Sequence, residues 1–341
     1  MIGQEFIVLI FFATVGGLVV FSIVYKQYSK RRQIAESIAR ANAYRTRKDH
    51  TAAAITAYKR VLELDPSSLE AHRALAELYS RSERYPEAIS SYGKLIQVDG
   101  ADYDSLNNLG KLHEESKQLD RAAEYYQAAI ESSPESVTTY QSLGRVYQRL
   151  NRTREAIETY RKAIEISPTS TQIRHQLAEA YESQGSNEEA ISQYQEAIKI
   201  VPDDPNNYNS LAALYTRLKM YAEAVRAYQQ ALKRHPSSEV IQTNLGIAYY
   251  RSKNYERAIK ELRQALGNSP NYAPAKYTLA AALAESGTNL NEALELLVAA
   301  VNHDPNLLNA AQTDTAFREL RLKPEFKSYF GGQAPPPTYN G

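Results

Sequence analysis

Residues 137–170 read VTTYQSLGRVYQRLNRTREAIETYRKAIEISPTS. The first half carries apolar or small residues at the spacing of one helix face: Tyr140, Leu143, Gly144 and Tyr147. The second half places Ala156 four residues before Tyr160, and Pro168 then ends the helical pattern. Small residues let two helix backbones approach closely, and a Tyr ring fills the space beyond them. The segment therefore predicts two helices packed against each other.

The same pattern recurs along most of the chain with a period of 34 residues. Prolines stand at positions 66, 134, 168, 202, 236, 270 and 305, and Gly100 takes the place of the missing one. Aligned on this period, the chain contains eight units that start at 35, 69, 103, 137, 171, 205, 239 and 273. A fixed period of this length indicates stacked helical repeats.

This pattern resembles the tetratricopeptide repeat (TPR) family, whose signature is W-x2-L-G-x2-Y, then A-x3-F, then P. Tyr147 and its equivalents match the Y of the signature, Tyr replaces the F in six units, and Trp is absent from the sequence. The resemblance covers residues 35–305 and implies an all-α, right-handed superhelix of about eight helix–turn–helix repeats. Asn42 and Arg45 depart from the signature, so the first unit is expected to be an atypical cap. Residues 306–330 predict one amphipathic capping helix.

The N-terminal segment has the composition of a membrane span. Residues 6–25, FIVLIFFATVGGLVVFSIVY, contain no charge and are long enough to cross a bilayer core of ~30 Å as a helix. Basic residues follow within the juxtamembrane segment that ends at residue 34: Lys26, Lys30, Arg31 and Arg32. Their position predicts a single-pass protein with its N-terminus outside and its repeats on the cytoplasmic or stromal side. The alternative, a cleaved signal peptide, carries positive charge before the apolar run and small residues after it.

Composition argues against several other functions. The chain has 40 basic and 39 acidic residues, a balance that predicts no attraction to nucleic acid. It contains no Cys, and its six His occupy different positions within their units. With no catalytic motif, we expect no enzyme activity, catalytic residue, metal, cofactor or small-molecule substrate. The acid pairs Glu114–Glu115 and Glu188–Glu189 are interpreted as solvated helix positions.

The C-terminal residues 331–341 are rich in Gly and Pro and are expected to form a flexible tail. Within the tail, residues 336–339 read PPTY, which matches the ligand pattern of WW domains. A pattern of four residues carries little information, so the plain flexible tail is favoured.

A partner is expected on the first helix of each unit, opposite its core-facing stripe, because the TPR resemblance implies a concave groove lined by these helices. In the unit that starts at 103 this places Asn108 in the groove and Asn107 on its flank. Seven units contribute to the row: Ala74, Asn108, Ser142, Gln176, Ser210, Asn244 and Thr278. Hydrogen-bonding side chains in such a row can pair with the backbone of an extended peptide. The alternative is that small polar residues simply suit a wet surface.

The rows beside it change character along the chain. The early units carry charged residues, among them Lys111, Arg145 and Arg149, and the later ones carry the apolar Val240, Ile247 and Tyr277, with Arg251 at the edge. Clustered exposed apolar side chains often mark an interaction site. We therefore expect the unit that starts at 239 and the beginning of the next to hold an apolar anchor of the partner.

An anchor combined with a groove predicts a membrane-anchored scaffold that binds a protein or peptide partner. Proteins of this layout look like TPR assembly factors of bacterial inner membranes and of cyanobacterial or plastid thylakoids. The implied role is assembly, biogenesis or regulation of a membrane protein complex, photosynthetic complexes included. Two alternatives stay open: a receptor subunit of a protein import or secretion machine that recognises targeting peptides, and a regulatory subunit of an enzyme.

Overall fold

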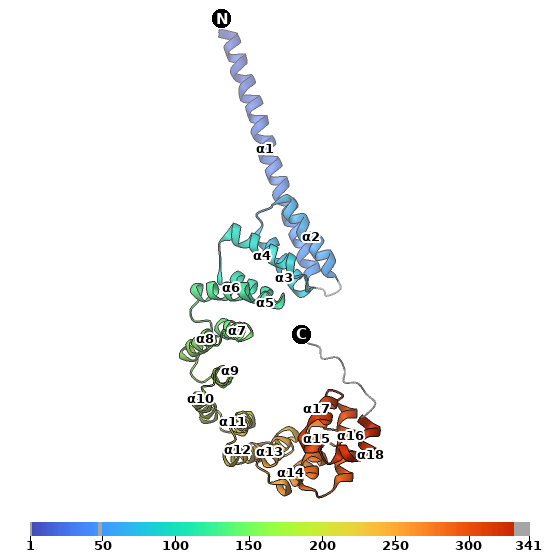
Figure 1. Ribbon diagram of the computed structural model, residues 1–341. Coiled ribbons are helices and arrows are strands. Elements are labelled where there is room, and N and C mark those ends of the chain that lie inside the picture. The colour runs from blue at the N-terminus through green and yellow to red at the C-terminus, as the bar shows by residue number, and fades with distance from the viewer. Residues whose placement is uncertain (1, 47–49, 331–341) are drawn as a thin grey trace. The chain divides into compact units, whose positions relative to one another are not determined.

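The computed structural model describes the backbone of residues 2–46 and 50–330, and the side chains of residues 22, 23, 25–46 and 50–330. The chain divides into two compact units, Met1–Ser167 and Pro168–Gly341. In the described part of the chain every regular element is an α-helix or a short 3-10 helix, and within each unit neighbouring helices along the chain pack against each other (Figure 1). The predicted all-α helical repeat architecture is confirmed.

Unit 1 contains one long helix followed by alternating helices of similar length. The long helix is α1, Ile2–Arg45, which packs against α2, Thr51–Leu64. Three helix pairs follow: α3 Leu69–Arg81 with α4 Tyr85–Asp99, α5 Tyr103–Glu115 with α6 Leu119–Ser132, and α7 Val137–Arg149 with α8 Thr153–Ile166. In Figure 1, α5 and α7 lie on one side of this path, whereas α6 and α8 lie on the other.

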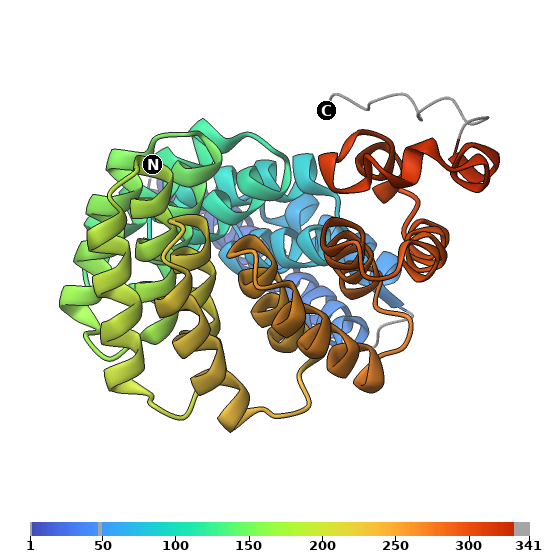
Figure 2. The same ribbon diagram turned by 60° about the horizontal axis from the view of Figure 1, so that its bottom comes forward.

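Unit 2 continues the alternation with four helix pairs, which lie side by side from yellow-green to orange in Figure 2. The pairs are α9 Thr171–Gln184 with α10 Asn187–Ile200, α11 Pro205–Arg217 with α12 Tyr221–Arg234, α13 Glu239–Arg251 with α14 Tyr255–Asn268, and α15 Ala273–Ser286 with α16 Leu290–His303. From α3 onward, the first helix of each pair begins at the residue where the sequence period places a unit start.

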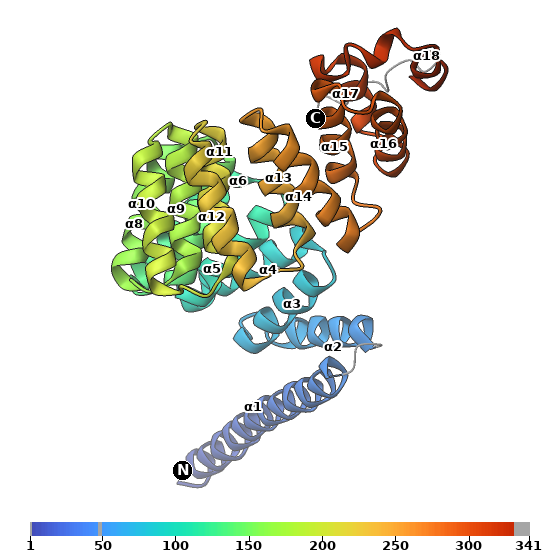
Figure 3. The ribbon, with the colours of Figure 1, turned by 90° about the horizontal axis from the view of Figure 1, so that it is seen from below.

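The two ends of the array differ from the expectation in instructive ways. The first predicted repeat does not begin with a separate helix at residue 35, because α1 runs without interruption from Ile2 to Arg45. The C-terminal segment is broken into four short elements: α17 Leu307–Thr313, η2 Thr315–Phe317, η3 Leu320–Leu322 and α18 Pro324–Phe330. Figure 3 shows α17 and α18 beside α15 and α16. The expected single capping helix was wrong because Asp314 adopts an extended backbone and Pro324 cannot continue a helix.

Two expectations lie outside the described residues. The side chains of the predicted span, residues 6–25, are described only at Ser22, Ile23 and Tyr25, and the tail 331–341 is not described. Within the described part of the chain, no helix has the length and apolar character needed to cross a membrane.

Two glycines show why the first helices need small residues at the packing surface. A Cβ on Gly110 would lie 2.6 Å from the Tyr126 ring, and one on Gly144 would lie 2.5 Å from the Tyr160 ring. Tyr160 is completely buried and Tyr126 is nearly so. Each glycine therefore admits the aromatic ring of the second helix into the space that its own side chain would occupy.

The turn inside each pair is tight and conserves its geometry through the repeats. Five turns hold a non-glycine residue in the left-handed region: Glu83, Lys117, Asn151, Lys219 and Lys253. Gly185 and Gly287 take this place in two others. In six of these seven turns the next backbone N–H donates to a carbonyl five residues earlier, as from Gln118 to His113 at 2.8 Å, and the turn at Gly287 is the exception. This bond fixes the angle at which the second helix returns.

Candidate functional site

A hollow of about 440 Å³ lies between the first helices α5 and α7 of unit 1. It is lined by Asn107, Lys111, Glu114, Glu115, Tyr126, Thr138, Ser142 and Arg145. Apart from Tyr126, which comes from α6, all these side chains project from the two first helices. This surface is the one where the sequence places a partner, and it is predominantly polar.

Asp102 fixes the start of α5 and thereby the register of its side chains. Its carboxylate accepts a hydrogen bond from the backbone N–H of Ser105 at 2.7 Å, which caps the helix. Residues Asn107, Lys111 and Glu114 then follow at spacings of four and three, so they lie along one face. The opposite face buries Leu109 and Leu112 in the core.

Glu114 is the charged centre of the hollow. Its side chain is only 11% exposed, and its two oxygens accept bonds from Arg145 Nε at 3.1 Å and Arg145 Nη2 at 3.2 Å. Arg149 Nη1 donates to the same carboxylate at 3.0 Å, and the Tyr126 hydroxyl donates to it at 3.2 Å. These contacts tie α7 and α6 to α5. They hold Arg145 in one orientation in the wall of the hollow.

The electrostatics of this cluster follow from burial and from the ion pair. The hydrogen bond to Glu114 raises the pKa of the Arg145 guanidinium, because the carboxylate stabilises the charged form. Burial, reinforced by the Glu114 charge, raises the pKa of the Tyr126 hydroxyl. Both groups therefore keep their ordinary protonation state at neutral pH, and the cluster acts as a fixed framework.

The same arrangement recurs in unit 2, where Glu182 pairs with Arg217 and accepts a hydrogen bond from the Tyr194 hydroxyl at 2.9 Å. The Glu182 side chain is 15% exposed. The interpretation of the Glu114–Glu115 pair as solvated was thus wrong for Glu114, while Glu115 is exposed. A sequence signal for these Glu–Arg ion pairs exists: Arg149 follows Glu114, and Arg217 follows Glu182, by one repeat plus one residue.

The remaining polar residues of the hollow lie on and beside the predicted row. Asn107, expected on the flank, lines the hollow, and its Oδ1 accepts a hydrogen bond from the Thr139 hydroxyl at 3.1 Å. Asn108 is half-buried and does not line the hollow. Lys111 and Glu115 are exposed, and no ion pair involves either in the described part of the chain. They are the charges available to a ligand.

In unit 2, the predicted residues of α13 lie on one helix face. Val240, Asn244, Ile247 and Arg251 follow at spacings of four, three and four. Val240 is 42% exposed, Arg251 is exposed, and Asn244 and Ile247 are half-buried. Asn244 Nδ2 donates to Asn209 Oδ1 at 3.2 Å, so its amide already serves a contact between α13 and α11.

Tyr277 has a different role from the predicted one. Its hydroxyl donates to Asp314 at 2.9 Å and its ring meets Phe317 edge-on at a centroid distance of 5.3 Å. It thus belongs to the contact between α15 and the C-terminal segment. Gln176 and Ser210 are half-buried on α9 and α11. Thr278, the last member of the predicted row, is buried on α15, and its hydroxyl donates to the Pro274 carbonyl at 2.9 Å.

Comparison with known proteins agrees with this description. Residues 127–242 match the TPR domain of cytochrome c-type biogenesis protein H, and residues 73–137 and 251–314 match two further tetratricopeptide repeat profiles. A search of curated proteins found no match.

Two solved structures illustrate the likeness in fold. The C-terminal part of a TPR repeat-containing protein from Cytophaga hutchinsonii is 18% identical, with a TM-score of 0.59, over 70% of this chain and 98% of that one. A tetratricopeptide repeat protein from Parabacteroides merdae is 19% identical, with a TM-score of 0.50, over 73% of this chain and 98% of that one. The helix pairs thus recur with the sequence period, and residues 73–242 and 251–314 are similar to tetratricopeptide repeats.

Proposed function

We propose that this protein is a membrane-anchored scaffold that binds a protein partner on the face formed by its first helices. The observation that carries the proposal is the polar hollow between α5 and α7, where Glu114 holds Arg145 in place and Lys111 and Glu115 remain available. A rigid surface with free charges of both signs suits a peptide with polar side chains, because ordering the site costs little on binding.

An assembly or biogenesis role for a membrane protein complex is the biological setting we propose. The match of residues 127–242 to the TPR domain of cytochrome c-type biogenesis protein H supports it. Residues 6–25 would supply the anchor, and Lys26, Lys30, Arg31 and Arg32 would keep the repeats on the cytoplasmic or stromal side. The membrane would be a bacterial inner membrane or a thylakoid membrane.

The anchor is tested separately from the scaffold. The full chain should stay with membranes after alkaline carbonate extraction, and deletion of residues 1–25 should release it. Release of the full chain by carbonate would reject the anchor and leave the binding surface untouched.

The binding surface is tested by site-specific photocrosslinking from Ser142, which lines the hollow, in solubilised native membranes. We expect one or two defined partners, lost in a Lys111→Glu variant and kept in a Lys94→Glu variant, since Lys94 is exposed on the second helix α4. Equal crosslinking in both variants would reject the hollow as the binding face. Many unrelated partners with targeting peptides would indicate a receptor instead.

The apolar part of the predicted surface needs its own variant. Ile247→Asp places a charge on the exposed face of α13 and should weaken capture of the same partner. Unchanged capture would restrict the binding surface to unit 1. The double variant Asn108→Ala with Asn244→Ala tests the polar row in the same assay, and unchanged capture would show that the row only faces solvent.

A further inference from the structure

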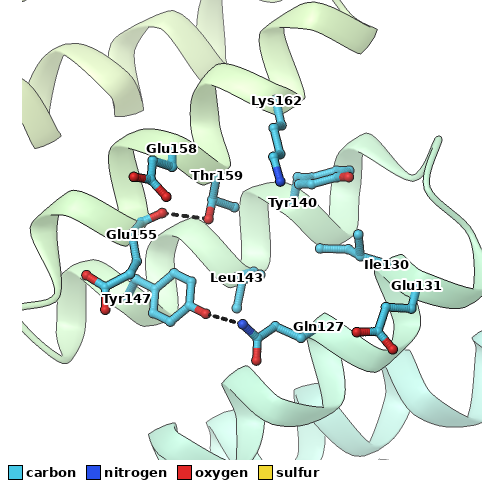
Figure 4. Close-up of a pocket in the computed structure, with 10 residues that line it drawn as sticks. All are labelled: Gln127, Ile130, Glu131, Tyr140, Leu143, Tyr147, Glu155, Glu158, Thr159 and Lys162. Atoms are coloured by element: carbon cyan, nitrogen blue, oxygen red, sulfur yellow. Dashed lines mark hydrogen bonds between the residues drawn. The ribbon is translucent and has the colours of Figure 1, made fainter.

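A second hollow, of about 390 Å³, lies on the side of unit 1 formed by the second helices α6 and α8 (Figure 4). Its floor consists of Tyr140, Leu143 and Tyr147 from α7, together with Ile130. Its rim carries Gln127, Glu131, Glu155, Glu158, Thr159 and Lys162. The hollow does not share any lining residue with the one between α5 and α7.

Two carboxylates of this rim are available to a ligand. Glu155 pairs with Arg152 at 2.8 Å, and Gln127 donates to the Tyr147 hydroxyl at 2.7 Å, so these groups are engaged. Glu131 and Glu158 are exposed, and neither takes part in an ion pair in the described part of the chain. Lys162 contributes the single positive charge of the lining. Acidic groups therefore outnumber basic ones around an aromatic and aliphatic floor.

Tyr140 belongs to the floor of the hollow, where its hydroxyl is open to a ligand. The residue is 9% exposed, no hydrogen bond to its hydroxyl is formed in the described part of the chain, and the hydroxyl is not one of the buried polar atoms without a partner, so water can reach it. Buried polar groups in folded proteins are normally hydrogen-bonded, by protein or by water. Because Tyr140 lines the hollow, a ligand that enters it can replace this water as the partner of the hydroxyl (Figure 4).

Unit 2 shows which chemical group fits beside this tyrosine. Tyr208 occupies the position of Tyr140 two repeats later, and the Arg234 guanidinium lies over its ring at 4.3 Å from the centroid. Arg234 also donates to the Tyr208 hydroxyl at 3.0 Å and to the Pro202 carbonyl at 2.6 Å. One guanidinium thus stacks on the ring and donates hydrogen bonds to the hydroxyl and to the turn carbonyl.

Most of these acceptors are repeated in unit 1, but the arginine is not. Pro134 and Tyr140 are the equivalents of Pro202 and Tyr208, whereas Ile166 stands at the position of Arg234. Two other turns also receive a nitrogen donor, since His72 bonds the Pro66 carbonyl and Arg174 bonds the Pro168 carbonyl, both at 2.9 Å. Six residues after Pro134 the chain has Tyr140, where these two turns have His72 and Arg174.

From this vacancy we infer that the hollow between α6 and α8 binds an arginine side chain presented by a partner protein. The aliphatic stem of the arginine lies against Ile130 and Leu143, and the guanidinium meets Tyr140, with Glu131 and Glu158 balancing its charge. Arginine is favoured over lysine because its planar group can stack on the ring and donate to several acceptors at once.

The test uses the full chain in detergent with fluorotyrosine incorporated at position 140 and observed by fluorine NMR. The probe is acetyl-Gly-Arg-Gly-amide, and the norleucine and lysine analogues are compared with it. We expect a saturable shift with the arginine peptide, at least about tenfold weaker binding of both analogues, and a similar loss in the Glu131→Gln/Glu158→Gln variant. Glu165→Gln, an exposed change on α8 outside the hollow, should bind like the wild type.

Ile166→Arg provides an independent check. It places the chain's own arginine where unit 2 has Arg234, so it should abolish the response to the peptide while the circular dichroism spectrum stays unchanged. A folded Ile166→Arg protein that binds the peptide like the wild type would overturn the inference. So would a response that is equal for the norleucine or lysine analogue, or the absence of any saturable shift. Lys111→Glu should leave this response intact, which separates it from the proposed partner-binding face.

Discussion

Removing Glu114 should loosen the contact between α5 and α7 by a measurable amount. The Glu114 side chain is 11% exposed, and its removal eliminates two hydrogen bonds from Arg145, one from Arg149 and one from Tyr126. The two arginines are 49% and 43% exposed, so water replaces much of what they lose. Allowing about 1 kcal/mol for the Arg145 pair and about 1 kcal/mol for the other bonds, Glu114→Ala should cost about 2 kcal/mol.

The measurement is amide hydrogen exchange of residues 103–149 in a double-mutant cycle of Glu114→Ala and Arg145→Ala. Local exchange is the suitable probe because a repeat array need not unfold as one cooperative unit. We expect the two variants to couple by about 1 kcal/mol, and we expect exchange to rise most in α5 and α7. Glu115→Ala, the exposed neighbour, is the control and should change protection by less than about 0.5 kcal/mol.

A coupling energy within about 0.5 kcal/mol of zero would refute the reasoning, since independent sites add within that margin. The reasoning would also be refuted if Glu115→Ala increased exchange in α5 as much as Glu114→Ala does. In either case the ion pair would be a surface contact without structural weight, and the fixed orientation of Arg145 in the proposed binding face would have to be abandoned.

Two further predictions concern stability. Gly144→Ala places a Cβ 2.5 Å from the Tyr160 ring and should destabilise unit 1 by about 1–3 kcal/mol, whereas Gly93→Ala, which has no atom within 4 Å, should stabilise α4 by up to about 1 kcal/mol; equal urea midpoints would contradict this. Burial lowers the pKa of His113 below its usual 6.5. The imidazole of His113 therefore binds a proton more readily in the unfolded chain than in the folded one. The stability that comes from burying the neutral ring is fully present above pH 6.5 and is lost as the pH falls from 6.5 toward the folded pKa. His113→Tyr should reduce the pH dependence of the urea midpoint over this range, whereas His303→Tyr, at an exposed site, should not change it. An unchanged pH dependence in His113→Tyr would count against the burial argument.

The repeat period shows how much of the fold is written in the sequence. The start of the first helix in each pair, from Leu69 to Ala273, follows from a 34-residue spacing of proline, alanine and tyrosine. These signals are local, because helix capping, chain breaking and the spacing of apolar residues act within one or two turns. The break at Pro324 is also predictable from the sequence, because Pro cannot continue a helix. The extended backbone of Asp314, which ends α17, is seen only in the structure.

The partners of most polar side chains were decided by the tertiary structure. Helical spacing assigns a residue to a face, but it does not fix which neighbouring side chain lies within 3 Å of it, because that depends on how far apart adjacent helices stand and how they turn. Glu114 therefore meets Arg145 and Arg149 from the next repeat, and Asn107 lines the hollow where Asn108 was expected. For the same reason the missing guanidinium beside Tyr140 becomes visible only when the arginine over Tyr208 is seen in place.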